Sequence, residues 1–131
     1  MASKGRGFRA LEIEGFEVLV GKGDADNDRL TFGVAEPRDF WLHVAGAPGS
    51  HVIVRNPGEL PELPRAVAEA AAQLAAWHSK ARGARGKLEV HLCRVADVSK
   101  PQGFAPGEVR LRRFESIRVY AKEPEGTSPI P

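Results

Sequence analysis

The sequence predicts a single α+β domain in which a mixed or antiparallel sheet packs with one long and one short helix. Three observations predict this class. The 131 residues and the 42% hydrophobic content suit one core. Short runs that alternate apolar and polar residues recur between turns rich in glycine and proline, as strands do. One longer segment instead repeats its apolar residues with a helical period.

The first half of the chain predicts a hairpin, a short helix and two strands. Residues 8–20 alternate around a central glycine, which is typical of two short strands joined by a tight turn. Asp24 stands at a helix N-cap position with further aspartates after it, so we expect a short helix over residues 24–33. The apolar runs Phe40–Val44 and Val52–Val54 predict strands on either side of an irregular loop.

The clearest element is a long helix. It is expected to begin at Pro64, which suits a first helical turn, and to end at Gly83, which suits a C-terminal cap. Apolar residues recur at spacings of three and four, so one face should be buried. The residues predicted on that face are Val67, Ala70, Ala71, Leu74, Trp77, His78 and Ala81.

The last third of the chain predicts strands around one loop. Residues 88–93 have the composition of a strand, residues 98–107 form a loop rich in proline and glycine, and residues 109–111 and 117–120 predict the final strands. We expect the domain to cover residues 1–122. The remaining residues, 123–131, hold three prolines and no apolar pattern, which predicts a flexible tail.

Composition limits the classes of protein. The single cysteine, Cys93, cannot form an internal disulfide, and the start of the chain lacks the apolar stretch of a signal peptide, so a cytoplasmic location is expected. No run reaches the roughly 18 apolar residues needed to span a bilayer, so no membrane partner is expected.

Charge is unevenly distributed along the chain. Residues 1–76 carry 8 lysines and arginines against 11 acidic residues, a net charge of −3, whereas residues 77–118 carry 10 against 4, a net charge of +6. A basic second half favours a polyanionic partner, most commonly nucleic acid. Charge by itself is equally consistent with an ordinary solvated surface.

The residues that could hold a metal ion are not arranged for it. The aspartates that begin at Asp24 resemble the start of a calcium loop, but Arg29 and Ala35 stand where such a loop needs glycine and glutamate. The four histidines, His43, His51, His78 and His91, show no ligand spacing with one another or with the cysteine. We therefore expect no metal and no cofactor.

Two loops have the composition of phosphate-contacting segments. Residues 48–51 and 99–107 combine glycine and proline with hydroxyl, imidazole and lysine groups, and such loops expose donors to phosphate oxygens. Phe104 lies in the second loop and could stack on an unpaired base. Trp41 and Trp77 have the same capacity but are predicted to lie in the core.

A series of motifs over residues 8–120 resembles the NFACT-R domain. In order, the motifs are Gly15, Val18-Leu-Val-Gly21-Lys22, Asn27-Asp28-Arg-Leu30, Asp39-Phe-Trp41-Leu-His43-Val, Pro48-Gly49-Ser50-His51-Val52, Ala75-Ala-Trp-His-Ser79-Lys80-Ala-Arg82 and Lys100-Pro101-Gln-Gly103-Phe-Ala-Pro106-Gly107. The resemblance implies RNA binding, which the family links to tRNA and the large ribosomal subunit in quality control of stalled nascent chains. It implies no catalytic residue.

The chain departs from the family pattern in two respects. The N-terminal lobe, helical hairpins and linker of the larger family members have no counterpart here, so a stand-alone form is expected. One loop of the family is rich in lysine, and two of those lysines are replaced in this chain by Gln102 and Ala105. Arginines just downstream are expected to compensate.

The resemblance and the basic second half together predict an RNA-contacting set. Its members are His43, Ser50, His51, Ser79, Lys80, Lys100, Arg110, Arg112 and Arg113. Within the set, Ser50 and His51 are expected at the exposed end of a strand pair close to Lys100, and Arg110 and Arg112 should point outward from one side of a strand.

The predicted partners are tRNA or ribosomal RNA, with no DNA. Two alternatives stay open. The first is an RNA-processing or tRNA-modifying enzyme, or its accessory subunit, that uses His43, His51 and His78. Its variant with a Ser79 nucleophile is disfavoured, since adjacent helical side chains diverge. The second is a protein-interaction adaptor, which would show an exposed apolar patch in place of a basic one.

Overall fold

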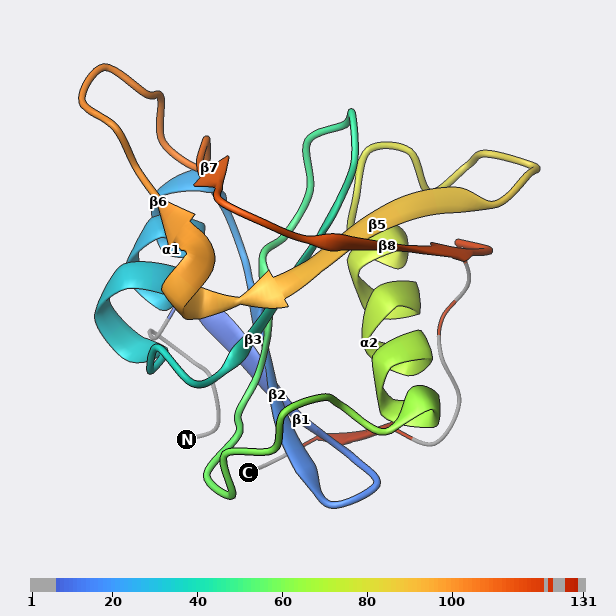
Figure 1. The fold of residues 1–131 in the computed structure, drawn as a ribbon. Coiled ribbons are helices and arrows are strands. Elements are labelled where there is room, and N and C mark those ends of the chain that lie inside the picture. The colour runs from blue at the N-terminus through green and yellow to red at the C-terminus, as the bar shows by residue number, and fades with distance from the viewer. Residues whose placement is uncertain (1–6, 122, 124–126, 130–131) are drawn as a thin grey trace.

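The computed structural model describes residues 7–121, 123 and 127–129 and has a seven-stranded sheet with a long helix across one face (Figure 1). The elements are β1 (Phe8–Ile13), β2 (Phe16–Gly21), α1 (Asp24–Arg29), the π-helical turn η1 (Leu30–Val34), β3 (Phe40–Val44), β4 (Val52–Val54), α2 (Arg65–Trp77), β5 (Leu88–Arg94), the 3-10 turn η2 (Val95–Asp97), β6 (Val98–Ser99), β7 (Arg110–Leu111), β8 (Glu115–Val119) and β9 (Thr127–Pro129). The predicted α+β class is confirmed.

The sheet is antiparallel throughout. Its strand order is β8-β5-β3-β4-β2-β1-β9, and β6 and β7 form a separate two-stranded ladder. The predicted hairpin is confirmed as β1 and β2, whose turn residues Glu14 and Gly15 have φ of 47° and 86°. Two left-handed residues match the twist that a two-residue hairpin needs.

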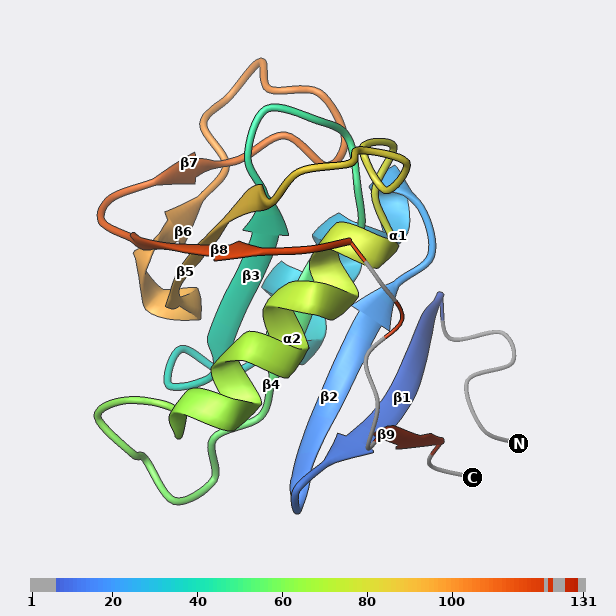
Figure 2. The same cartoon turned by 90° about the vertical axis from the view of Figure 1, so that its right-hand side faces the viewer.

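Both faces of the sheet are covered. Alternation along β4 sends Val52 and Val54 to a cluster under α2 and sends Ile53 to a second cluster on the other face. Figure 2 shows α2 lying across the first face. The second cluster includes Leu30 of η1 and residues from η2 and β6. The sheet therefore forms the middle layer of the domain.

The long helix ends earlier than predicted. It stops at Trp77, six residues before Gly83, because the chain then pairs with the turn between β3 and β4. The amide of Ser50 donates to the carbonyl oxygen of His78 at 3.0 Å, and the amide of Lys80 donates to the carbonyl oxygen of Pro48 at 2.8 Å. These bonds satisfy backbone groups that a longer helix would have satisfied within itself.

The buried face of α2 is also broader than predicted. Val67, Ala71 and Leu74 are buried, but Trp77 is half-buried, and the arginine at 82 covers its ring at 4.6 Å. The helix instead buries small residues, namely Ala68, Ala72, Ala75 and Ala76. The prediction that Trp77 belongs to the core is therefore wrong, whereas Trp41 is 2% exposed and its core prediction is confirmed.

The short helix also differs in detail from its prediction. It begins after Gly23, whose extended backbone forms the N-cap, and Asp24 is its first residue, not its cap. After Arg29 it continues as η1, in which Leu30 is buried and Phe32 is 45% exposed. Within the predicted tail, β9 pairs with β1. No helix of the described residues is long and apolar enough to cross a membrane.

Candidate nucleic-acid interface

Three loops meet at one end of the sheet, which we call the three-loop end. They are residues 45–51 between β3 and β4, residues 78–87 between α2 and β5, and residues 100–109 between β6 and β7. Both views of the fold place them at the same end (Figures 1 and 2). Backbone pairing joins the first loop to the second, and a side chain of the first reaches the third. The motifs at residues 48–51, 79–82 and 100–107 therefore lie together in space.

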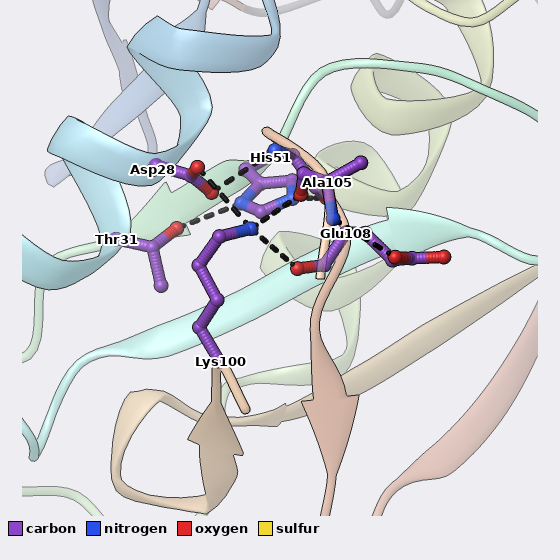
Figure 3. A network of polar contacts seen from close by, with 7 residues as sticks. Asp28, Thr31, His51, Lys100, Ala105 and Glu108 are labelled. Atoms are coloured by element: carbon purple, nitrogen blue, oxygen red, sulfur yellow. Dashed lines mark hydrogen bonds and ion pairs between the residues drawn. The ribbon is translucent and has the colours of Figure 1, made fainter. Parts of the chain in front are cut away.

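His51 is the buried centre of this end. It is 1% exposed, and its Nε2 lies 3.1 Å from the carbonyl oxygen of Gly107 while its Nδ1 lies 2.8 Å from the hydroxyl of Thr31 (Figure 3). A carbonyl oxygen only accepts, so Nε2 carries the proton and Nδ1 accepts from the threonine. The prediction that His51 lies near the Lys100 loop is confirmed, but the expectation that it is exposed is wrong.

Asn27 connects the short helix to the first loop. Its Oδ1 accepts from the amide of His51 at 3.0 Å, and its Nδ2 donates to the carbonyl oxygen of Gly49 at 3.2 Å. The side chain is 2% exposed. Gly21 leaves room for it, since a Cβ at that position would lie 2.0 Å from Oδ1. Asn27 thus satisfies buried backbone groups that the turn cannot pair within itself.

Lys100 closes the third loop on itself. Its Nζ donates to the carbonyl oxygens of Ala105 at 2.5 Å and Glu108 at 2.7 Å and lies 3.3 Å from Oδ2 of Asp28 (Figure 3). The amide of Gly107 donates to the other oxygen of the same aspartate at 3.1 Å. Two of the three ammonium donors are thus bonded to backbone carbonyls, and the charge is paired with Asp28. Lys100 therefore holds the loop against the short helix.

Three aromatic rings pack beneath the loops. Trp41 stacks on His43 with ring centroids 5.8 Å apart, and the His51 ring stands edge-on to both, at 5.1 Å and 5.5 Å respectively. Burial lowers the pKa of His43, and burial together with repulsion from His43 in its protonated form lowers the pKa of His51 to about 4. Both imidazoles are therefore neutral at pH 7.

The histidines do not form the arrangement that the enzyme alternative needs. The ring nitrogens of His51 bond to Thr31 and Gly107 and not to His43. His78 lies apart from them, with its Nδ1 3.3 Å from Nη1 of Arg9. Within the described part of the chain, no group of three or more His, Cys, Asp or Glu side chains is placed to hold a metal ion.

The two serines of the predicted set also build the junction of the loops. The hydroxyl of Ser50 donates to the carbonyl oxygen of Gly21 at 2.6 Å, and the hydroxyl of Ser79 donates to that of Ala76 at 2.7 Å. Ser79 is 9% exposed, and a Cβ at Gly49 would lie 2.8 Å from its Cβ. Their hydroxyls hold the turn against the end of α2.

The outward charge of the three-loop end comes mainly from the loop between α2 and β5. We call its four exposed cations, Lys80, Arg82, Arg85 and Lys87, the basic loop. No acidic residue lies between them. Beside it is a groove of about 270 Å³ whose lining includes Lys80, Arg82 and Trp77.

Aromatic rings lie under the cations of this end. Arg82 lies 4.6 Å from the centroid of the Trp77 ring, Lys87 lies 5.5 Å from that of Tyr120, and Arg110 lies 5.9 Å from that of Phe104. The predicted set contained Lys80 but missed the other three members of the basic loop. Four cations within eight residues, with no acidic residue among them, is the signal that identifies them.

The predicted arginines divide between two places. Arg110 is exposed on the third loop beside Phe104. Arg112 turns to Asp97, to which its Nε and Nη2 donate at 2.9 and 2.7 Å, and Nε of Arg113 lies 3.8 Å from the same oxygen. Arg112 and Arg113 line a separate groove together with Arg65. They therefore do not belong to the three-loop end.

The chain is similar to known proteins. Residues 6–113 match the family model described as the NFACT protein RNA binding domain. The chain is similar to proteins named Rqc2 homolog RqcH, with 36% identity over 106 residues in Streptococcus suis and 38% over 105 residues in Bacillus subtilis. These alignments cover 81% and 80% of this chain but 18% of each relative.

The fold is similar to a solved structure as well. That structure is the C-terminal part of the fibronectin/fibrinogen-binding protein from Streptococcus suis. The TM-score is 0.80 at 34% sequence identity, and the match covers 90% of this chain and 46% of the other.

Proposed function

This chain belongs to the family of NFACT protein RNA-binding domains, and from that premise we propose that it binds RNA through the basic loop at the three-loop end. The observation that carries the proposal is the cluster of four exposed cations beside a groove, on a scaffold that buried hydrogen bonds hold in place. A platform held by buried hydrogen bonds with exposed cationic side chains suits recognition of phosphate positions and of RNA shape.

Burial separates the residues of the three-loop end that position the loops from those that contact RNA. His51, Asn27 and Ser79 are buried, so they position the loops and do not reach RNA. Lys80, Arg82 and Arg110 are exposed and reach outward. The basic loop also supplies the charge that the third loop lacks at Gln102 and Ala105. The domain acts by binding, with no step of catalysis.

The RNA that we propose is structured and carries unpaired segments. Guanidinium and ammonium groups lie next to the rings of Trp77, Tyr120 and Phe104. The cations can bind phosphates, and the neighbouring rings can contact unpaired bases. Transfer RNA and large-subunit ribosomal RNA both present such elements. Similarity to relatives named Rqc2 homolog RqcH supports a role in ribosome-associated quality control, and we propose that this role is carried out in the cytoplasm.

A salt titration of RNA binding tests the proposal. The variant Arg82→Glu/Arg85→Glu removes two cations of the basic loop, and its affinity for tRNA and for a large-subunit rRNA fragment is compared with that of the unchanged protein. Each phosphate contact contributes about −0.7 to −0.9 to the slope of log affinity against log salt. We expect the variant to bind weakly, with a slope smaller in magnitude by about 1.5.

A single exposed arginine elsewhere provides the matched control. Arg38 precedes β3, so it lies at the opposite end of that strand from the three-loop end. Arg38→Glu should leave affinity and slope unchanged, while Arg85→Glu alone should reduce both. Equal effects of Arg38→Glu and Arg85→Glu would show that only total charge matters and that the basic loop is not the binding site.

A further inference from the structure

A second basic region lies away from the three-loop end. It is a groove of about 760 Å³ beside α2, η2 and β8, and none of its lining residues lines the groove beside the basic loop. Five arginines line it, and we call it the arginine groove. They are Arg65, Arg94, Arg112, Arg113 and Arg118. Its acidic lining residues are Glu62, Asp97 and Glu115, so cations outnumber anions.

Two of the five arginines are held by the protein itself. Arg94 donates to the carbonyl oxygens of Leu60 at 2.9 Å and Pro61 at 3.0 Å, and its guanidinium lies over the ring of Phe40. Arg112 donates twice to Asp97, which is 8% exposed. These two arginines fix the wall of the groove and neutralise its buried acid.

The other three arginines extend toward solvent. The side chains of Arg65 and Arg113 are 84% and 75% exposed, and Arg118 is exposed on β8. Arg65 pairs with Glu69 at 2.8 Å, but exposed ion pairs of this kind are weak and exchange readily for another anion. Arg113 Nε lies 3.8 Å from Asp97, and three exposed guanidinium groups thus line one groove.

An aromatic ring lies among these cations. Phe114 follows Arg113 directly and is 49% exposed, unlike most large apolar side chains of the domain. One side of its ring contacts the His91 ring, with centroids 4.0 Å apart. Its remaining exposed surface faces solvent within the lining of the groove. A flat apolar surface next to guanidinium groups is the combination on which unpaired bases stack.

We propose that the arginine groove binds a single-stranded segment of RNA, with phosphates on Arg65, Arg113 and Arg118 and one base stacked on Phe114. A duplex offers no free base face for Phe114, so the ring favours an unpaired strand. An acidic peptide would satisfy the guanidinium groups but would leave the ring without a stacking partner. The domain then holds RNA at two separate places and can bridge two segments of one RNA.

The test uses the protein with the basic loop silenced by Arg82→Glu/Arg85→Glu, so that the arginine groove is measured alone. The probes are a fluorescently labelled RNA decamer and an abasic decamer with the same phosphates. Replacing Phe114 by leucine keeps an apolar side chain but removes the ring. We expect Phe114→Leu to weaken binding of the normal decamer about tenfold and to leave binding of the abasic decamer unchanged.

Charge reversal of two groove arginines tests whether they bind phosphates. Arg113→Glu/Arg118→Glu should weaken binding of both decamers, and circular dichroism confirms that each variant is folded. Equal binding of the normal decamer by Phe114→Leu and its parent would overturn the proposal, as would a labelled decaglutamate peptide that binds the groove more tightly than the RNA does.

The basic loop and the arginine groove can be tested separately as RNA-binding sites. When each double variant is made in the otherwise unchanged protein, loss of tRNA binding in Arg82→Glu/Arg85→Glu and not in Arg113→Glu/Arg118→Glu would overturn the arginine groove alone. The reverse result would overturn the basic loop and support the groove.

Discussion

Lowering the pH from 7 to 5 should cost the folded domain about 2 kcal/mol through His51 alone. Burial, followed by the charge of His43, lowers the pKa of His51 in the folded chain to about 4, whereas an exposed histidine titrates near 6.5. Between these values the unfolded chain binds a proton that the folded chain does not. Stability from this group is therefore complete above pH 6.5 and falls as the pH decreases toward 4, to a limit of about 3 kcal/mol.

The cost arises from the contacts of the ring. The nitrogen that would gain the proton is Nδ1, which accepts from the Thr31 hydroxyl at 2.8 Å, so protonation forces the hydroxyl to reorient. The charges around the ring act in both directions. Asp28 favours the protonated form, while His43 and Lys100 disfavour it, and burial exceeds them all. No acid bonds directly to the ring in the described contacts.

Urea unfolding at pH 7 and pH 5 measures this cost, with His51→Gln as the comparison. The wild-type protein should lose about 2 kcal/mol more than the variant between the two pH values, because glutamine does not titrate. The lowered pKa of His43 adds a smaller loss to both proteins. An NMR titration in which the His51 ring protonates near pH 6.5, or equal losses in the two proteins, would show that His51 does not cause the loss of stability.

Three further predictions concern single side chains. Asn27→Ala leaves the amide of His51 and the carbonyl of Gly49 without their partner, and urea unfolding should show a loss of about 2 kcal/mol; a loss below about 0.5 kcal/mol would mean that water replaces it. Burial and the charge of Asp97 raise the pKa of the Cys93 thiol to about 12, so a disulfide reagent at pH 8 should modify the native protein about a thousandfold more slowly than the unfolded chain, and equal rates would contradict this. Lys100→Met should speed hydrogen exchange across residues 101–108 and leave the salt slope of RNA binding unchanged, whereas a slope reduced by about 1 would show that Lys100 contacts phosphate.

Local sequence patterns predicted which helices and strands form, but they did not predict the residues at which those elements end. Compact apolar runs correctly placed the strands Phe40–Val44 and Val52–Val54, since strands that are buried on both faces carry few polar residues. The end of α2 was misplaced because the backbone after Trp77 pairs with a turn some thirty residues earlier in the chain. Such a contact competes with helix propensity, and no local pattern reports it.

The same distinction applies to the candidate site. The motifs identified which loops come together, and the structure places them at one end of the sheet. Whether a polar side chain faces solvent depends on distant partners. Lys100 is engaged by two backbone carbonyls and an aspartate of the short helix, and no residue type in the loop indicates this. The exposed Arg82 and Arg85 lay outside the predicted set, although their spacing without acidic neighbours was visible in the sequence.

Crosslinking in cells shows whether residues 78–87 contact RNA. The protein is crosslinked by ultraviolet light, purified under denaturing conditions, and its bound RNA is sequenced while the crosslinked peptides are mapped by mass spectrometry. We predict enrichment of tRNA or large-subunit rRNA, with crosslinks in residues 78–87 that disappear in Arg82→Glu/Arg85→Glu. RNA recovery no higher than from an uncrosslinked sample, or crosslinks that persist unchanged in the variant, would contradict it.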